Sequence, residues 1–81
     1  MKDVQDMYIV DHGFLDATRT EDGGAVDKSQ VVAVEYGYKT NGKYEGKVGF
    51  VLNYSAYEIE VTTPNGTVET IPSFGYVKYY K

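Results

Sequence analysis

The residues that could take part in catalysis are few in this 81-residue chain. Its single histidine, His12, follows Asp11, and such a pair can activate a hydroxyl group that the fold brings near. The same pair also arises by chance in an acidic protein, where the histidine packs or bonds within a turn. No serine stands in a nucleophile-elbow pattern. We therefore expect no catalytic residues and no enzyme activity.

Two glutamates, Glu58 and Glu60, are two residues apart in a segment with strand-like alternation. In a strand this spacing places both side chains on one face, roughly 7 Å apart, which is compatible with the paired acids of a glycoside hydrolase. Alternating glutamates are also an ordinary way to keep an exposed strand face soluble. We expect the second role.

Neither a metal ion nor an organic cofactor is expected. The chain has no cysteine, which removes disulfides and thiolate metal sites. Asp16, Asp22 and Asp27 offer hard oxygen ligands suited to calcium, but their spacing misses the EF-hand pattern. No glycine-rich phosphate loop follows a strand and opens a helix, so nucleotide binding has no support.

Nine tyrosines are the most distinctive chemical feature of the sequence. Tyrosine combines an apolar ring with a polar rim, which suits sugar stacking or protein contact. Period-two alternation places Tyr36, Tyr38 and Tyr54 with valine, phenylalanine and leucine, so we expect these three in or beside the core. The remaining candidates for carbohydrate or protein contact are Tyr44, Tyr57, Tyr76 and Tyr80.

The formal net charge of −4 is concentrated in the first third of the chain, where seven acidic residues precede Lys28 against two basic ones. Such a balance repels a phosphate backbone, so no nucleic-acid partner is expected. No apolar run is long enough to span a bilayer, so no membrane partner is expected either. If the acidity has a role beyond solubility, its residues are those of an acidic interaction face: Asp16, Glu21, Asp22 and Asp27.

Five segments alternate apolar and polar residues with period two and predict the strands that must position these groups. The turns between them are marked by Asn41-Gly42, by Pro64-Asn65-Gly66 and by a break at residues 72–75. The predicted strands are residues 31–38, 47–55, 57–62, 67–71 and 76–80.

The first thirty residues give a less regular pattern. Residues 3–12 fit a short helix and a buried strand equally well, and residues 16–30 are small, polar and acidic, as in a loop. We therefore predict one mainly β domain over residues 1–81. It comprises a lead-in and acidic loop (1–30) and an antiparallel meander (31–81), folded as a small five-stranded sandwich or open barrel with a short N-terminal helical or irregular segment.

Three segments, VVAVEYGYKTNGK, GFVLNYS and TIPSFGYVKYY, together resemble the small C-terminal β-domains of bacterial glycoside-hydrolase-like proteins. In that resemblance residues 7–15 look like the lead-in from a catalytic barrel, residues 31–36 like the strand before a turn, and residues 50–54 and 71–77 like the later strands. The barrel itself is absent from this sequence. The resemblance therefore implies a non-catalytic accessory domain that packs on a larger enzyme.

Two functions remain open. The first is a structural accessory β-domain of a carbohydrate-active protein, with a parent catalytic domain as partner and weak carbohydrate contact. The second is a stand-alone small acidic protein-interaction protein, such as a phage or mobile-element inhibitor that covers a basic surface. Localisation follows the choice: extracellular or cell-surface for a domain of a larger enzyme, and cytoplasmic otherwise.

Overall fold

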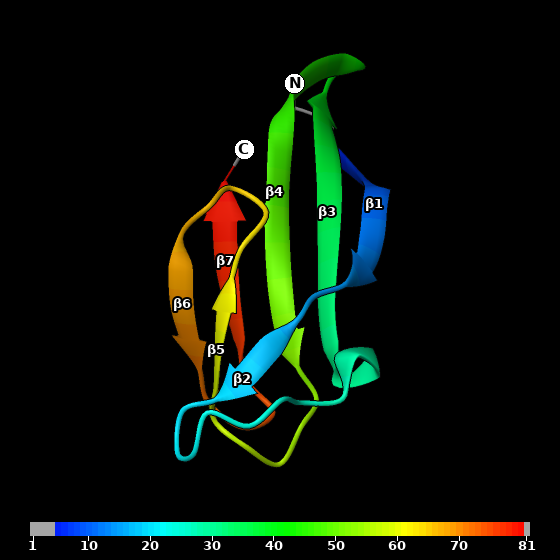
Figure 1. The fold of residues 1–81 in the computed structure, drawn as a ribbon. Coiled ribbons are helices and arrows are strands. Elements are labelled where there is room, and N and C mark those ends of the chain that lie inside the picture. Colours follow the sequence, from blue (N-terminus) through cyan, green and yellow to red (C-terminus); the bar gives the residue numbers. More distant parts are fainter. Residues whose placement is uncertain (1–4, 81) are drawn as a thin grey trace.

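A computed structural model of the protein describes residues 5–80, and the side chains of residues 7–79 (Figure 1). This part of the chain is almost entirely strand and turn, and its only helical element is the three-residue 3-10 helix η1 (Lys28–Gln30). No helix in it has the length and apolar character of a membrane span. The seven strands are β1 (Gln5–Phe14), β2 (Ala17–Arg19), β3 (Val31–Thr40), β4 (Lys43–Asn53), β5 (Ile59–Thr62), β6 (Val68–Ile71) and β7 (Tyr76–Tyr80).

The strands form two antiparallel sheets that face each other. A four-stranded sheet has the order β1-β3-β4-β7, and a three-stranded sheet has the order β2-β5-β6. The prediction of a mainly β, antiparallel fold is confirmed, whereas the count of five strands is wrong. The two sheets do not close into a barrel. The path also differs from a simple meander, because β5 and β6 join the other sheet before β7 returns to pair with β4.

The two strands beyond the predicted five lie in the first thirty residues. Residues 3–12 fitted a short helix and a buried strand equally well, and the described part of this segment is strand: it belongs to β1, which pairs with β3 with an irregularity at Val10, and its residues 7–10 are exposed. The short β2, inside the predicted loop, pairs with β5. The alternation of apolar and polar residues did not identify these strands clearly. In β1 the irregularity at Val10 shifts the alternation by one residue, and β2 is only three residues long. The positions before Gln5 lie outside the described residues.

The turns formed where the sequence placed them. Asn41 and Gly42 have φ values of 53° and 79°, the left-handed conformation that a tight hairpin between β3 and β4 requires. Gly66 has φ 91° in the turn between β5 and β6, and residues 72–75 separate β6 from β7. Local turn chemistry was therefore a sufficient guide at these positions.

The core lies between the sheets and is built from small and β-branched side chains. Val31 and Val51 of the larger sheet meet Ile59 and Ile71 of the smaller one, and all four are completely buried. In β3 and β4 the buried face is thus the one that carries Val31, Ala33 and Val51. The prediction that Tyr36, Tyr38 and Tyr54 mark the core side is wrong: Tyr36 and Tyr38 lie half-buried on the opposite face and Tyr54 is exposed.

Two glycines on the inner face of the larger sheet make room for tyrosine rings from the neighbouring strand. Gly37 lies opposite Tyr8 and Gly49 opposite Tyr79 in the strand register. A Cβ atom on Gly37 would come within 2.6 Å of the Tyr8 ring, and one on Gly49 still closer to the Tyr79 ring. Each tyrosine ring therefore packs over the backbone of the opposite glycine. This contact replaces the side-chain packing that a glycine cannot provide in a strand.

Candidate interaction surface

The four-stranded sheet has one face that no other part of residues 5–80 covers, and we call it the outer face. Cross-strand pairing places its residues in rows, because directly opposed residues of antiparallel strands share a face. Through the pairs of β1 with β3, β3 with β4 and β4 with β7, the outer face consists of Met7, Ile9, His12, Phe14, Val32, Val34, Tyr36, Tyr38, Val48, Phe50, Leu52, Tyr76 and Lys78.

Aromatic side chains hold the centre and margin of the outer face. The Tyr36 and Phe50 rings meet edge to face with centroids 6.0 Å apart, and Phe50 meets Tyr76 at 6.1 Å. Tyr76 is nevertheless 62% exposed and Phe14, at the β1 side, 56% exposed. Exposed apolar side chains therefore pack on one another across neighbouring strands of this face.

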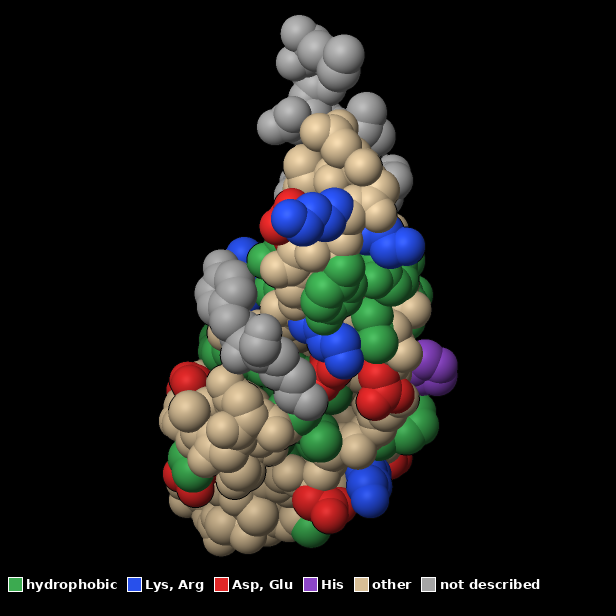
Figure 2. All heavy atoms as spheres, turned by 90° about the horizontal axis from the view of Figure 1, so that it is seen from above, with side chains coloured by type: hydrophobic (Ala, Val, Ile, Leu, Met, Phe, Trp, Pro, Cys, Tyr) green, Lys and Arg blue, Asp and Glu red, His purple; other side chains and the backbone are tan. Residues whose placement is uncertain are grey.

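The described side chains of the outer face are rarely charged. Its rows contain Lys78, which is exposed, and His12, and no aspartate or glutamate among residues 7–79 belongs to them. In the view from above, hydrophobic side chains reach the surface among basic and acidic ones, and the single histidine lies at the margin of this view (Figure 2). Contiguous apolar patches on a protein surface often mark the sites at which other molecules bind.

The four candidate tyrosines are not brought together. Tyr44 lies near the tip of the β3–β4 hairpin, Tyr57 lies in the β4–β5 connection, and Tyr76 lies on the outer face. Each of the three is exposed. Tyr80 ends β7, and its side chain lies outside the described part. Only Tyr76 therefore belongs to a wider aromatic surface.

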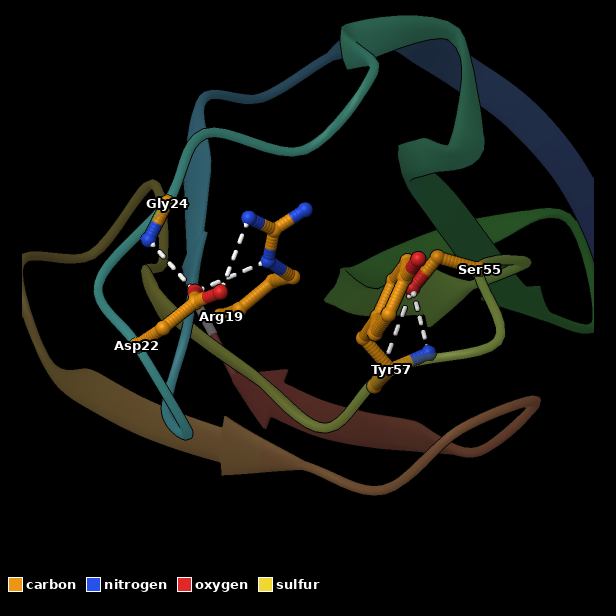
Figure 3. Close-up of polar contacts among 5 residues, drawn as sticks. All are labelled: Arg19, Asp22, Gly24, Ser55 and Tyr57. Carbon is orange, nitrogen blue, oxygen red and sulfur yellow. Dashed lines mark hydrogen bonds and ion pairs between the residues drawn. The ribbon is translucent and has the colours of Figure 1, made fainter.

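One residue of the predicted acidic face, Asp22, is bonded to Arg19 and Gly24 of its own loop (Figure 3). Arg19 Nε and Nη2 donate to the two carboxylate oxygens of Asp22 at 2.9 and 3.0 Å, and Gly24 N–H donates to Asp22 Oδ1 at 2.9 Å. The hydrogen bond from Arg19, and then that from Gly24, lowers the pKa of Asp22. The same guanidinium lies 5.0 Å from the centroid of the Tyr57 ring, a cation–π contact.

The other three acidic candidates do not join Asp22 in one cluster. Ser29 donates to Asp27 Oδ1 through its hydroxyl at 2.8 Å and its backbone N–H at 3.0 Å, which lowers the pKa of Asp27. Asp16 lies 3.6 Å from Lys28 Nζ, and Glu21 is exposed in the turn after β2. Within residues 5–80 no three histidine or acidic side chains gather as ligands for a metal ion.

A pocket of about 200 Å³ lies between the end of β1 and the β5–β6 turn, on the inner side of the larger sheet. Asp11 and Glu35 are opposed in the strand register, so both lie on this inner side. Glu35 is only 8% exposed, and its Oε1 accepts a hydrogen bond of 3.1 Å from the Tyr79 hydroxyl. Burial, and then the Glu35 carboxylate, raises the pKa of Tyr79 far above its usual value.

The sequence pairs that suggested catalysis are separated or otherwise bonded. His12 and Asp11 fall on opposite faces of β1, and their contact runs from the His12 backbone N–H to Asp11 Oδ1 at 2.8 Å. Glu58 accepts a 2.7 Å hydrogen bond from the Thr20 hydroxyl, while Glu60 is exposed on β5. Asp11 and His12 both line the pocket at the end of β1, but no serine or threonine hydroxyl lines it with them.

A buried amide, that of Asn53, joins the β4–β5 and β6–β7 connections, and the sequence analysis did not single it out. Asn53 is 1% exposed; its Nδ2 lies 2.7 Å from the Tyr57 carbonyl and 3.0 Å from the Pro72 carbonyl, and its Oδ1 accepts from Ser55 N–H and hydroxyl at 2.9 and 2.6 Å. Ser73 donates to the Ser55 carbonyl at 2.8 Å. An asparagine at the end of a strongly apolar strand was the available signal for this role.

The chain matches no family model, no curated protein and no solved structure. Function therefore has to be argued from the surfaces described above. Glu35 and Asn53 are the two residues of functional or organising interest that the pattern of the sequence did not single out. Glu35 could have been noticed as the one charged side chain within an otherwise apolar and aromatic run of β3.

Proposed function

We propose that this chain is a non-catalytic β-domain that packs on a folded partner protein through the outer face. The observation that carries the proposal is the outer face itself, with exposed Phe14, Ile9 and Tyr76 around a half-buried aromatic centre. Exposed apolar surface of this extent is costly for a free domain and favourable at an interface. The sequence resemblance favours the catalytic domain of a carbohydrate-active protein as that partner.

The chemistry of the outer face indicates what kind of partner surface it fits. Its exposed side chains are mainly apolar and aromatic, so it fits an apolar partner surface with polar groups at the rim. The proposed contact is with a folded domain of another protein, and self-association is the alternative that sedimentation of the isolated chain would detect.

The absence of catalysis is part of the proposal. It is supported by the opposite orientation of Asp11 and His12 on β1 and by the hydrogen bond that engages Glu58 with Thr20. The pocket that Asp11 and His12 both line contains no serine, threonine or lysine that the pair could activate.

Weak sugar contact is the finer part of the proposal, and Tyr76 supports it best because its ring is 62% exposed on the face that also carries Phe50. Amide shifts of labelled protein, titrated with oligosaccharides from cellulose, chitin and starch, provide the test. Shifts centred on Tyr76 are expected, and an unchanged spectrum with every sugar would remove carbohydrate from the proposal.

The acidic inhibitor-like function receives less support. Asp22 is held by Arg19, and Asp27 is capped by Ser29, so two of the four acids already have partners within their own loop. A partner that needs this loop would lose affinity when Asp16 and Glu21 are changed to Asn and Gln, whereas a partner of the outer face would not.

The decisive experiment uses the protein encoded beside this chain, in the same reading frame or operon, and measures Kd by calorimetry. Phe14→Ser and Tyr76→Ser should each weaken binding at least tenfold, about 1.4 kcal/mol. Val68→Ser and Tyr54→Ser are matched controls, because these side chains are equally exposed but lie off the outer face. Equal losses in both sets, or no loss in the first, would contradict the proposal.

A further inference from the structure

One edge of the larger sheet is formed by β1. Within residues 5–80, β1 pairs with β3 on one side and no strand lies against its other side. The apolar residues at positions 7–10 of this edge are all exposed, and Ile9 is the most exposed of them at 60%. Proteins usually protect such an edge with a lysine or a proline, because its unpaired backbone groups attract another strand. Residues 7–14 contain neither.

The other sheet edges in the described part of the chain carry protection of this kind. The β2 edge of the smaller sheet is partly covered, because Thr18 forms a bridge with Ala25. The β6 edge is only four residues long and contains Glu69. At the far edge of the larger sheet, β7 has Lys78 at its centre. Short strands and charged side chains both oppose pairing at an edge, so β1 is the edge most open to another strand.

The side chains of β1 alternate in a way that is almost the same when the strand is read from either end. Its pairing with β3 places residues 7 and 9 on the outer face before the bulge at Val10, and residues 12 and 14 on the outer face after it. Residues 8, 11 and 13 lie on the inner side. A second β1 can therefore be laid antiparallel over the whole range Gln5–Phe14 with like faces opposed.

We propose that two copies of the chain pair through β1 in this register, antiparallel and around a two-fold axis between Ile9 and Val10. Met7 then lies opposite His12 of the other copy, and Tyr8 opposite its Asp11, so opposed residues share a face in both halves of the strand. The two larger sheets form one continuous sheet, with four strands from each copy. Each copy supplies backbone hydrogen bonds to the free side of the other β1 and covers its exposed apolar residues.

The bulge favours a second copy of the chain over a regular strand of another protein. A regular strand alternates its faces without interruption, so it follows both halves of β1 only if Val10 stays unpaired, as it does beside β3. A second β1 has the same irregularity, and the full-length register places the two bulges side by side at the axis. Ile9 of each copy then lies opposite Val10 of the other, and the faces match on both sides of this central pair.

The position of Asp11 also favours the full-length register. In this register the two copies of Asp11 are offset by three residues, roughly 10 Å along the strands. A shifted register with Asp11 opposite Val10 would bring the two carboxylates next to each other, and like charges in neighbouring cross-strand positions are destabilising. The full-length register therefore combines the longest overlap with separated acids.

This dimer leaves the outer face free for the partner proposed above, and neither proposal depends on the other. The outer faces of the two copies become continuous across the axis, because outer-face residues are opposed there. Tyr76 lies on β7, at the opposite edge of the sheet from β1. Tyr76→Ser should therefore weaken binding of the proposed partner and leave the dimer unchanged.

Sedimentation equilibrium of the intact chain over a range of concentrations tests the proposal. A monomer–dimer equilibrium is expected, and Val10→Lys should raise its Kd at least tenfold, because the two introduced lysines would lie side by side at the axis. Val68→Lys is the matched control, because Val68 is an exposed residue of the β6 edge and this change should leave the Kd unchanged. A chain that stays monomeric at every concentration, equal effects of the two substitutions, or loss of the dimer in Tyr76→Ser would overturn the proposal.

Paired cysteine substitutions report the register, since the chain has no cysteine of its own. On mild oxidation, a mixture of Met7→Cys and His12→Cys chains should form mixed disulfide-linked dimers at least tenfold faster than either variant forms them with itself. Two copies of position 7 lie roughly 16 Å apart along the strands in this register, too far for a disulfide. Mass spectrometry distinguishes the products, and equal rates for mixed and unmixed pairs would contradict the proposed pairing.

Discussion

Tyr79 carries a polar group into the interior of the sandwich. Its ring is 4% exposed and lies over Gly49, while its hydroxyl donates to Glu35. Alternation in the sequence placed residues 79 and 80 on opposite faces but could not say which face is buried. That choice depends on the smaller sheet, whose position is set by contacts distant in the chain.

At the same site, Gly49→Ala should destabilise the fold. A Cβ atom there would overlap the Tyr79 ring, and overpacking of a closed site costs about 1–3 kcal/mol. Gly13→Ala is the matched control, because a Cβ at Gly13 meets no atom within 4 Å. Urea unfolding of both variants gives the comparison, and equal stability of the two would contradict the close approach of Tyr79.

Stability should also fall in alkaline solution because of Tyr79. Its pKa is raised in the folded protein, so the unfolded chain loses this proton first, above about pH 10. From there to the raised folded pKa, the free energy of unfolding should decrease by about 1.4 kcal/mol per pH unit from this group. Below pH 10 the group contributes no slope.

Denaturant curves between pH 8 and pH 11.5 measure this effect. Tyr79→Phe should remove the alkaline slope, although the loss of the hydrogen bond to Glu35 also lowers stability at every pH. Tyr54→Phe is the control, because Tyr54 is 54% exposed and should keep the slope of the original protein. A slope that persists in Tyr79→Phe would assign the effect to another group.

At the scale of the elements, the positions of the β4–β5 and β6–β7 connections are held by one side chain, that of Asn53. Asn53 lies close to the Tyr57 and Pro72 carbonyls, one from each connection. Asn53→Ala leaves these buried acceptors without their donor, and a loss of about 2–4 kcal/mol is expected from the thermal or urea transition. Tyr54→Ala, next in the chain but exposed, should stay within about 0.5 kcal/mol.

Asn53→Asp refines this prediction by its pH dependence. A carboxylate among carbonyl oxygens is disfavoured in its charged form, so its folded pKa would lie above the unfolded value of about 4. The variant should therefore be most stable below pH 4 and lose stability as the pH rises toward 7. A variant equally stable at both pH values would show that the carbonyl groups do not surround this position.

Sequence patterns were informative for elements whose determinants are local. Turns at Asn41-Gly42 and Gly66 depend on backbone conformations that few residues adopt, so they were predictable. The strands β1 and β2 depend instead on partners distant in the chain, and Met7 to Val10 fits more than one structure until β3 is placed beside it. The outer face and the pocket were hidden for the same reason, since each combines residues from at least three strands.

Over the whole molecule, packing is uneven along the long axis. The chain extends over 53 × 21 × 17 Å, because the β3–β4 hairpin continues beyond the smaller sheet (Figure 1). Val31 and Val51 are completely buried near one end, whereas Lys43 and Tyr44 near the hairpin tip are exposed. The free energy of local opening should therefore decrease toward the tip.

Native-state hydrogen exchange can measure this gradient. Amides of Val31 and Val51 should exchange only through global unfolding, while bonded amides near Tyr44 should open with much lower free energy. Uniform protection along β3 and β4 would contradict the gradient. Binding of the proposed partner to the outer face should raise the hydrogen-exchange protection of amides in the parts of β3 and β4 that the smaller sheet does not cover.

The buried Asn53 also decides where a glycan can be attached. Asn53-Tyr54-Ser55 and Asn65-Gly66-Thr67 both match the acceptor tripeptide for N-linked glycosylation. The atom to be modified at Asn53 is the same amide nitrogen that lies 2.7 Å from the Tyr57 carbonyl inside the protein. A glycan at Asn53 is therefore incompatible with the folded state. In a host that glycosylates proteins, attachment of a glycan to Asn53 would compete with folding of the chain. Asn65, exposed in the β5–β6 turn, is the acceptor that a folded chain presents.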